Sequence, residues 1–421
     1  MDRREFLRMS GLGSIGLSRV RNAPARVPSA EGEIMTVSGP IPPSRLSSTL
    51  AHEHVLVDFI GADKISRDRY NASEAYEVVL PFLQKARELG CRGFVECTPA
   101  YLGRDPGLLQ RLSKATGLHI LTNTGYYGAA KDQYVPRHAD DETADQLAGR
   151  WVKEWTDGIE GTGIRPGFIK TGVDAGPLSP LDRKLIQAAA RTHARTGLTI
   201  ASHTGDTRAA TDQLQVLAEE QIGPDAIIWV HAQNDWDLES RAAAGEKGVW
   251  IEIDNVSEKT VPECVGRVGA LKERGLLNRL LVSHDAGWYT PGEPRGGSIR
   301  GFEAVYTAFV PALRKAGWTP AEIDQLLVRN PAAAFTVRIR RRSAANQAEP
   351  GARRREPPAS PVDPRAGSRP LDWSRNMRVL AALSFAAALP AGTACGGHST
   401  RSPSADNRKH QRPPAASLPA R

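Results

Sequence analysis

The sequence has few cysteines, and their spacing excludes two common kinds of small, cross-linked domain. Four cysteines occur among 421 residues, at positions 91, 97, 264 and 395, and no two of them stand at a paired spacing. A disulfide framework or a zinc ribbon needs regularly spaced pairs. We therefore expect Cys91, Cys97 and Cys264 to be small buried thiols.

The sequence also lacks a hydrophobic run that could cross a membrane. The apolar segment from Val379 to Leu389 has eleven residues, whereas a spanning helix needs about 20. Its flanks, residues 377–378 and 392–395, resemble a lipoprotein signal peptide that is out of place near a C-terminus. The remainder of 338–421 is rich in Arg, Pro, Ala and Ser without periodicity, which predicts a disordered tail. This tail is either a read-through artefact that joins a second reading frame or a genuine unfolded segment.

Basic charge is missing from the middle of the chain, although the whole has a net charge of +8. Residues 338–421 contain sixteen Lys or Arg and five Asp or Glu, and residues 1–30 contain six Arg and two acids. The part between them must therefore carry a net charge of −7. A body of this charge is not expected to bind nucleic acid.

The first 30 residues have the pattern of an export signal. Arg3 and Arg4 precede Phe6-Leu7, a short apolar stretch follows, and Ala23-Pro24-Ala25 offers a cleavage site. The adjacent arginines resemble a twin-arginine signal, the route that carries folded proteins. We expect a periplasmic or secreted protein, and a cytoplasmic one if the segment is only a basic arm.

Between these ends, apolar runs alternate with longer helical patterns. Eight strand-like runs are followed by eight helical stretches, and Gly often stands where a helix should end. This alternation predicts βαβ units with a parallel sheet, and eight units in about 300 residues favour a closed (β/α)8 TIM barrel of class α/β over residues 35–337. The predicted strands are 50–57, 93–98, 118–124, 167–172, 198–203, 226–232, 249–254 and 279–285.

Metal-ligating residue types stand at the ends of five of these strands. His52 and His54 lie two residues apart, so in a strand they share one face and can hold one ion. Catalytic groups of a barrel gather at the C-terminal ends of its strands. The other residues at such ends are Lys170, His203, His231 and Asp285.

With these residues the sequence resembles the phosphotriesterase family of the amidohydrolase superfamily over about 290 residues. The matching motifs are His52-x-His54, Gly103-Arg104-Asp105, Thr124-Gly125-Tyr126-Tyr127, Phe168-Ile169-Lys170, Ser202-His203-Thr204-Gly205, His231 and Ser283-His284-Asp285. The resemblance implies a site for two divalent ions, with His52, His54 and Asp285 on the more buried ion. It implies His203 and His231 on the more exposed ion, and Lys170, carboxylated by carbon dioxide, as the bridge.

The physical chemistry of Lys170 agrees with this implied role. A lysine inside a barrel has a lowered pKa, so its neutral amine can form a carbamate, which is an anionic ligand on a long stem. Two divalent ions with the carbamate, Asp285 and a bridging hydroxide leave a small positive charge, which can neutralise an anionic transition state formed from a neutral ester. We expect Zn²⁺, with Mn²⁺ or Co²⁺ as alternatives, and we expect Asp285 to accept the proton.

The resemblance is weaker around the substrate. In phosphotriesterases proper, a carboxylate three residues after the sixth-strand histidine and a histidine on strand seven form a proton relay. Here Asn234 and Asn255 stand at those positions, and Asp235 or Asp254 are the only neighbours that could substitute. Related lactonases carry an arginine near position 255, which is missing, and a tyrosine that Tyr127 matches.

We therefore predict a phosphotriesterase-like hydrolase of ester bonds, with lactone or carboxylic ester hydrolysis as the alternative. A metal-binding barrel without turnover is the alternative of another class. The expected partner is a small ester or lactone, and a homodimer stays open. Besides Tyr127, candidate substrate contacts in the long loop after the last strand are Trp288, Tyr289 and Arg295.

Overall fold

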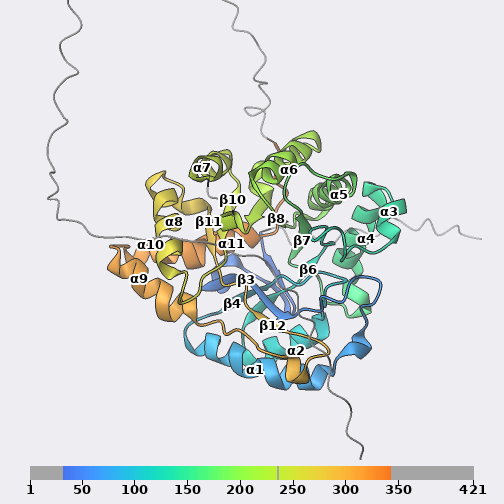
Figure 1. Ribbon diagram of the computed structural model, residues 1–421, viewed down its shortest axis with the longest axis horizontal. Coiled ribbons are helices and arrows are strands. Elements are labelled where there is room, and N and C mark those ends of the chain that lie inside the picture. Colours follow the sequence, from blue (N-terminus) through green and yellow to red (C-terminus); the bar gives the residue numbers. More distant parts are fainter. Residues whose placement is uncertain (1–31, 235–236, 343–421) are drawn as a thin grey trace, which may run out of the picture. The chain divides into compact units, whose positions relative to one another are not determined.

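The structure is a computed structural model that describes residues 32–234 and 237–342 (Figure 1). The predicted export signal, Asp235 and nearly all of the predicted tail lie outside the described residues. No helix among the residues that are described is long and apolar enough to cross a membrane.

Nine parallel strands follow the predicted order along the chain and gather at the centre of Figure 1. Each predicted run is a strand, and the third is divided in two by Thr122. These strands are β3 (Thr49–Leu56), β4 (Gly93–Glu96), β5 (His119–Leu121), β6 (Asn123–Thr124), β7 (Phe168–Val173), β8 (Ile200–Thr204), β9 (Ile227–Val230), β10 (Trp250–Ile253) and β11 (Leu280–Val282).

The strands form two parallel sheets that meet at both ends. One sheet has the order β11-β10-β9-β8-β7-β6, and the other has the order β12-β3-β4-β5, where β12 is Gly287–Tyr289. Thr122 connects β5 to β6, and the chain after β11 returns to β3. There the amide of Asp285 donates to the His52 carbonyl at 3.1 Å, and that of His54 donates to the Ala286 carbonyl at 2.9 Å. If β5 and β6 are counted as one position, the strands β3 to β11 occupy eight positions that follow one another around a ring.

Helices surround the strands in Figure 1. Helix α5 (Pro180–Thr196) has a favourable residue at each of its ends. The Ser179 side chain and Asp182 form a capping box at the start of α5, and Gly197 ends it with a left-handed φ of 77°. The long helices are α1 (Ala72–Glu88), α2 (Pro106–Thr116), α4 (Ala144–Asp157), α5 (Pro180–Thr196), α6 (Thr207–Glu219), α7 (Leu238–Lys247) and α8 (Val261–Glu273).

Shorter elements complete the described chain. The hairpin of β1 (Ile34–Thr36) and β2 (Gly39–Ile41) precedes the barrel. After β12 come a π-helical stretch (Val305–Phe309), α9 (Val310–Lys315), α10 (Pro320–Asp324), a second π-helical stretch (Gln325–Arg329) and α11 (Asn330–Phe335), and α3 (His138–Asp141) lies before α4.

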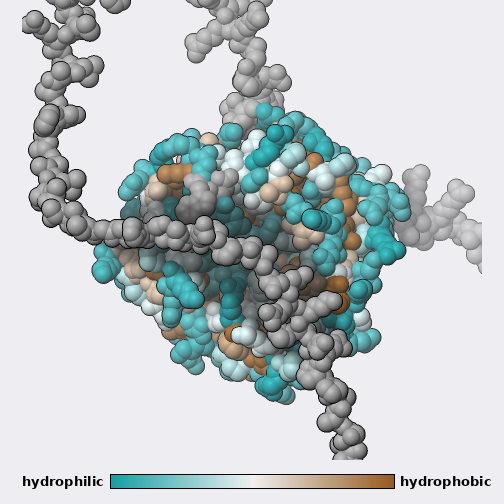
Figure 2. Space-filling model, in the orientation of Figure 1, coloured by the Kyte–Doolittle hydropathy of each residue, from teal (hydrophilic) through white to brown (hydrophobic). Residues whose placement is uncertain are grey.

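Two apolar layers hold these elements together. Alternate strand residues such as Val95, Phe168 and Ile228 fill the barrel interior, where Phe335 packs against Phe168 at one end. A larger layer joins the outer faces of the strands to the helices. Polar residues cover most of the face seen in Figure 2, with smaller apolar patches between them. The interior is thus filled below the C-terminal strand ends, which leaves polar groups at that end for chemistry.

Candidate metal centre

The six predicted ligands lie around one cavity at the C-terminal ends of the strands. Its volume is about 230 Å³. Apolar and aromatic side chains form the remainder of its wall. The lining residues are His52, His54, Val57, Phe59, Cys97, Pro99, Leu102, Tyr127, Lys170, His203, His231, Asp285 and Trp288.

His52, His54 and Asp285 form the first group of ligands. Oδ1 of Asp285 lies 3.1 Å from Nε2 of His54 and 3.8 Å from Nε2 of His52. Their ligand atoms lie within 4.8 Å of one another, close enough to share one ion. Burial lowers the pKa of His54. Burial by itself would raise the pKa of Asp285, but the hydrogen bond from His54 and the charge of His52 lower it, so the carboxylate is ionised.

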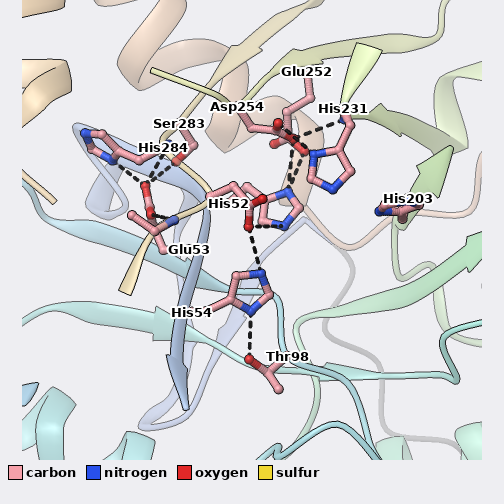
Figure 3. A network of polar contacts seen from close by, with 12 residues as sticks. His52, Glu53, His54, Thr98, His203, His231, Glu252, Asp254, Ser283 and His284 are labelled. Carbon is pink, nitrogen blue, oxygen red and sulfur yellow. Dashed lines mark hydrogen bonds and ion pairs between the residues drawn. The ribbon is translucent and has the colours of Figure 1, made fainter. Parts of the chain in front are cut away.

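The opposite ring nitrogens of these two histidines are held by other side chains. Nδ1 of His52 lies 3.1 Å from Oε2 of Glu252, and Nδ1 of His54 lies 2.8 Å from Oγ1 of Thr98 (Figure 3). Such outer partners fix the orientation of a metal-ligating imidazole and raise its basicity. Both Nε2 atoms therefore face Oδ1 of Asp285, where one ion would be bound.

His203 and His231 form a second pair, with ring centroids 4.5 Å apart. Nδ1 of His231 lies 2.7 Å from Oδ1 of Asp254, and Nδ1 of His203 lies 2.9 Å from the hydroxyl of Tyr127. Burial lowers the pKa of His203 well below its usual value, and the neighbouring His231 and Lys170 lower it further. A neutral imidazole is the form that binds metal.

Lys170 lies within β7, which continues to Val173 beyond the end predicted from the sequence, and its side chain is buried in the cavity wall, only 2% exposed. Its Nζ lies 3.5 Å from the carbonyl of Thr171 and 5.4 Å from the centre of the Tyr127 ring, and neither contact neutralises an ammonium group. Burial lowers the pKa of Lys170. The neutral amine that carboxylation needs is thus favoured, and the carbamate itself stays a prediction.

The backbone is strained at several cavity residues. His231, Asp285 and Trp288 have φ values of 60°, 52° and 76°, which non-glycine residues rarely adopt. Gly125, with a φ of 117°, lies so close to the Lys170 carbonyl that a Cβ would collide with it. Strain of this kind persists where surrounding contacts fix the chain, and it is concentrated at functional sites.

A second cluster of His and Asp side chains is centred on Asp254, whose carboxylate accepts several hydrogen bonds. His52, His231 and Asp254 also place ligand atoms within 4.8 Å of one another. The Asp254 carboxylate accepts from the His231 ring, from the His231 amide at 3.1 Å and from Nε2 of Gln233 at 2.5 Å. Burial by itself would raise the pKa of Asp254, but the charge and hydrogen bond of His231, together with those of His52, hold it well below its usual value. Asp254 therefore supports the ligands from outside the cavity.

Sequence reasoning missed Glu252 and Thr98 and left Asp254 undecided. The available signal was the spacing of Glu252 and Asp254, which places two carboxylates on one face of an otherwise apolar strand. Asn234 is exposed, and Oδ1 of Asn255 accepts from Sγ of Cys264 at 3.3 Å, away from the ligands. The two amides thus do not replace the relay.

The four candidate substrate contacts lie in three different environments. Tyr127 and Trp288 line the cavity. Tyr289 is buried and donates from its hydroxyl to Oε1 of Glu74 at 2.8 Å, and Arg295 is exposed in the loop and absent from the cavity wall. Phe59, 46% exposed, is an aromatic wall residue that the sequence did not indicate. Substrate contact stays a prediction for all four.

The donor set fits the divalent ions that the sequence implies. Four imidazoles, one ionised carboxylate and one buried lysine face a single cavity, and the outer nitrogens of the histidines are occupied. Imidazole and carboxylate are ligands of Zn²⁺ and its first-row neighbours. The fold and this cluster together define a metal-dependent hydrolase barrel.

The phosphotriesterase family model matches residues 32–335, and the chain belongs to that family. The family is one of binuclear-metal enzymes. A curated relative, the phosphotriesterase homology protein of Escherichia coli, is 28% identical over 291 residues, covering 68% of this chain and 97% of the relative. The human N-acetyltaurine hydrolase is 26% identical over 345 residues, covering 72% of this chain and 97% of that protein.

Solved structures confirm the predicted TIM barrel. A mutant of a PTE-like lactonase from Deinococcus radiodurans superposes with a TM-score of 0.65 at 28% identity, covering 72% of this chain and 99% of the other. An organophosphorus hydrolase from the same organism gives a TM-score of 0.65 at 27% identity, covering 74% and 100%. The chain is therefore a hydrolase of this family.

Proposed function

We propose that the protein hydrolyses neutral esters of carboxylic acids, with lactones as the first substrate class to test. His52, His54 and Asp285 would hold one divalent ion, His203 and His231 the other, and Lys170 both. When bound, these ions would activate a water molecule and polarise the ester carbonyl. Asp285 is ionised and lies on the cavity, so it can accept the proton of the attacking water.

One observation carries the choice of lactones over phosphotriesters. The Asn255 side chain is turned to Cys264, and the neighbouring Asp254 is committed to His231. The proton relay expected of phosphotriesterases proper is thus missing from strand seven. The Tyr127 hydroxyl, a feature expected of lactonases, lies on the cavity 2.9 Å from His203.

The wall of the cavity supports a substrate without charge. Val57, Phe59, Leu102 and Trp288 belong to the wall, and no arginine does among the described residues. Apolar walls with few polar groups orient a ligand by shape and by those few groups. Phosphotriesters are also neutral, so phosphotriester hydrolysis is the second candidate, supported by the likeness to the organophosphorus hydrolase.

A parallel screen tests this function. The protein loaded with Zn²⁺, Mn²⁺ or Co²⁺ is assayed on lactones, aryl esters, phosphotriesters and N-acyl amides, with Asp285→Asn as the inactive control. We expect the highest kcat/KM on lactones or carboxylic esters. Higher kcat/KM on a phosphotriester would make phosphotriester hydrolysis the main function. Amide hydrolysis alone would replace the proposal, and metal retention without any turnover would indicate a binding protein.

A further inference from the structure

Cys97 is buried, as the sequence predicts, and it brings a thiol to the cavity of the predicted ligands. It directly follows β4 and is 1% exposed. Val95 and Cys97 are two residues apart on one face of the strand, and both belong to the cluster that fills the barrel interior. The Cys97 side chain therefore lies above Val95, at the level where the neighbouring strands present their ligands, and it lines the cavity.

The two other cysteines that the structure describes have ordinary structural contacts. Sγ of Cys91 donates to the Gly93 carbonyl at 3.1 Å, and Sγ of Cys264 donates to Oδ1 of Asn255 at 3.3 Å. Each of these thiols uses its hydrogen on an oxygen outside the cavity. Cys97 differs because it lines the cavity that the ligands of the proposed metal centre also line.

The neighbours of the Cys97 thiol are the groups that would surround an ion. The Cys97 side chain lines the same cavity as His52 and Lys170. It is buried there, and it belongs to the cluster of side chains that fills the barrel interior directly below the ligands. Strands β3 and β7 and the strands after them supply the other polar groups of the cavity. Cys97 is thus the polar group that β4 adds to them.

We infer that Cys97 is an additional, sulfur ligand of the metal centre. This inference rests on the proposed binuclear site. On metal binding the thiol would release its proton to solvent, and its sulfur would bind the ion beside His52 and Lys170. A thiolate prefers soft and borderline ions, so Cys97 would make this centre select Zn²⁺, Co²⁺ or Cd²⁺ over Mn²⁺ and Mg²⁺.

Cobalt spectroscopy tests the inference without relying on turnover. Co²⁺ bound by a thiolate gives a sulfur-to-cobalt charge-transfer band in the near ultraviolet, whereas Co²⁺ bound by nitrogen and oxygen alone gives only weaker visible bands. We expect the charge-transfer band in the Co²⁺-loaded full chain. It should disappear in Cys97→Ser, which keeps a hydroxyl of similar size beside His52, and persist in the matched control Cys264→Ser.

Metal competition gives a second readout. Loss of an outer partner of a metal ligand costs about 10–100-fold in affinity, so loss of a direct ligand should weaken Zn²⁺ binding by about tenfold or more. The affinity for Mn²⁺ should change much less in Cys97→Ser, and Cys264→Ser should change neither. Cys97→Ala is the second variant, in case the serine hydroxyl itself binds the ion.

The outcomes separate this inference from the proposed function. Visible Co²⁺ bands without a charge-transfer band, or a band that survives in both Cys97 variants, would overturn the sulfur ligand and leave the metal site intact. A wild-type chain that binds no Co²⁺, Zn²⁺ or Mn²⁺ would instead overturn the metal site itself, and the inference with it.

Discussion

At the residue scale, three of the four histidine ligands are each fixed by a partner on the ring nitrogen opposite the one left for an ion. Glu252 holds His52, Thr98 holds His54, and Asp254 holds His231. A ligand that is already oriented loses little side-chain freedom when an ion binds. Changes to the ligands and to their partners should therefore appear first in metal affinity.

Replacement of Lys170 tests the bridge. Lys170→Ala removes an anionic ligand from both ions if the lysine is carboxylated, so metal content and turnover should fall together. Added formate or propionate can enter the vacated space and restore part of the rate. Lys170→Arg should not respond, because a guanidinium fills the space and keeps its positive charge. Elemental analysis and initial rates, with and without the acid, are the measurements. Full metal occupancy of Lys170→Ala without added acid would remove the carbamate from the mechanism.

Glu53, between the two histidine ligands in sequence, holds the loop that carries Asp285. It accepts from the His284 ring at 2.6 Å and from the Ala286 amide at 3.0 Å, while Nε2 of His284 accepts from the Val305 amide at 2.8 Å. His284 points away from the ligands, as its alternation along the strand predicts.

Glu53→Gln should therefore loosen Asp285 as well as the fold. The amide cannot accept all of these bonds, and leaving a buried donor unpaired costs about 1–3 kcal/mol. We expect a lower free energy of unfolding in urea together with about tenfold weaker metal binding. The control is Glu77→Gln on the exposed face of α1. Equal behaviour of the two variants would show that Glu53 does not position Asp285.

At the scale of elements, the sequence predicts the strands of the barrel well and the short connections poorly. Buried parallel strands such as β7 and β8 read as apolar runs between glycines, so their positions can be predicted without a structure. The hairpin of β1 and β2 has only three residues on each strand, and β12 lies in a Gly- and Pro-rich segment. Such pairings depend on tertiary contacts that no local pattern encodes.

For the same reason, the sequence predicts the metal ligands but not the side chains that hydrogen-bond to them. A ligand such as His231 interrupts an apolar run at a strand end, which makes it visible in the sequence. Glu252, on β10, and Thr98, just after β4, act only because the ring of strands brings their side chains to His52 and His54, as the hydrogen bonds show. Their roles can therefore be recognised only when the arrangement of the strands in space is known, and not from the order of residues along the chain.

Helix α5 contains a buried histidine whose titration should make the protein less stable in acid. Nδ1 of His193 donates to the Leu198 carbonyl and Nε2 accepts from the Arg340 amide, both at 2.8 Å, which fixes the neutral ring. Burial lowers the pKa of His193 to about 4, against about 6.5 in an unfolded chain. Between these values the unfolded state binds more protons, so stability is full above the unfolded pKa and falls as the pH decreases toward the folded one.

This loss should amount to about 3 kcal/mol for His193, since each pKa unit corresponds to about 1.4 kcal/mol. The measurement is the free energy of unfolding in urea at several pH values between about 4 and 7. His193→Gln keeps one donor and one acceptor but cannot titrate, so its pH dependence should be shallower by up to one proton. An unchanged slope would mean that other groups cause the acid sensitivity.

At the scale of the whole molecule, chain segments just outside the predicted domain boundary form hydrogen bonds with the barrel domain. The Gly32 amide donates to the Val337 carbonyl at 2.9 Å, and the Val337 amide donates to the Glu33 carbonyl at 2.8 Å. Beyond them the buried Arg340 donates from its guanidinium to Oγ1 of Thr199. The predicted domain of 35–337 contains the eight strands but omits these outer contacts. Their donors and acceptors are ordinary backbone groups and an arginine in a basic stretch, so the sequence gives no sign of them.

Two truncated chains should therefore differ although both contain every metal ligand. Residues 32–342 should fold, keep their metals and match the thermal midpoint of the full chain, because this range contains the outer contacts of Gly32, Val337 and Arg340. Residues 32–335 match the extent of the family model but lack Arg340, whose guanidinium donates to the carbonyls of Ala333 and Ala334. The shorter chain also loses the amide that donates to His193. Each buried acceptor left unpaired costs about 1–3 kcal/mol, so a loss of several kcal/mol is expected.

Thermal unfolding and metal content of the two chains are the measurements. Equal stability would place the end of the folded domain before Arg340, and insolubility of 32–342 beside a soluble full chain would show that the segments outside it are structural.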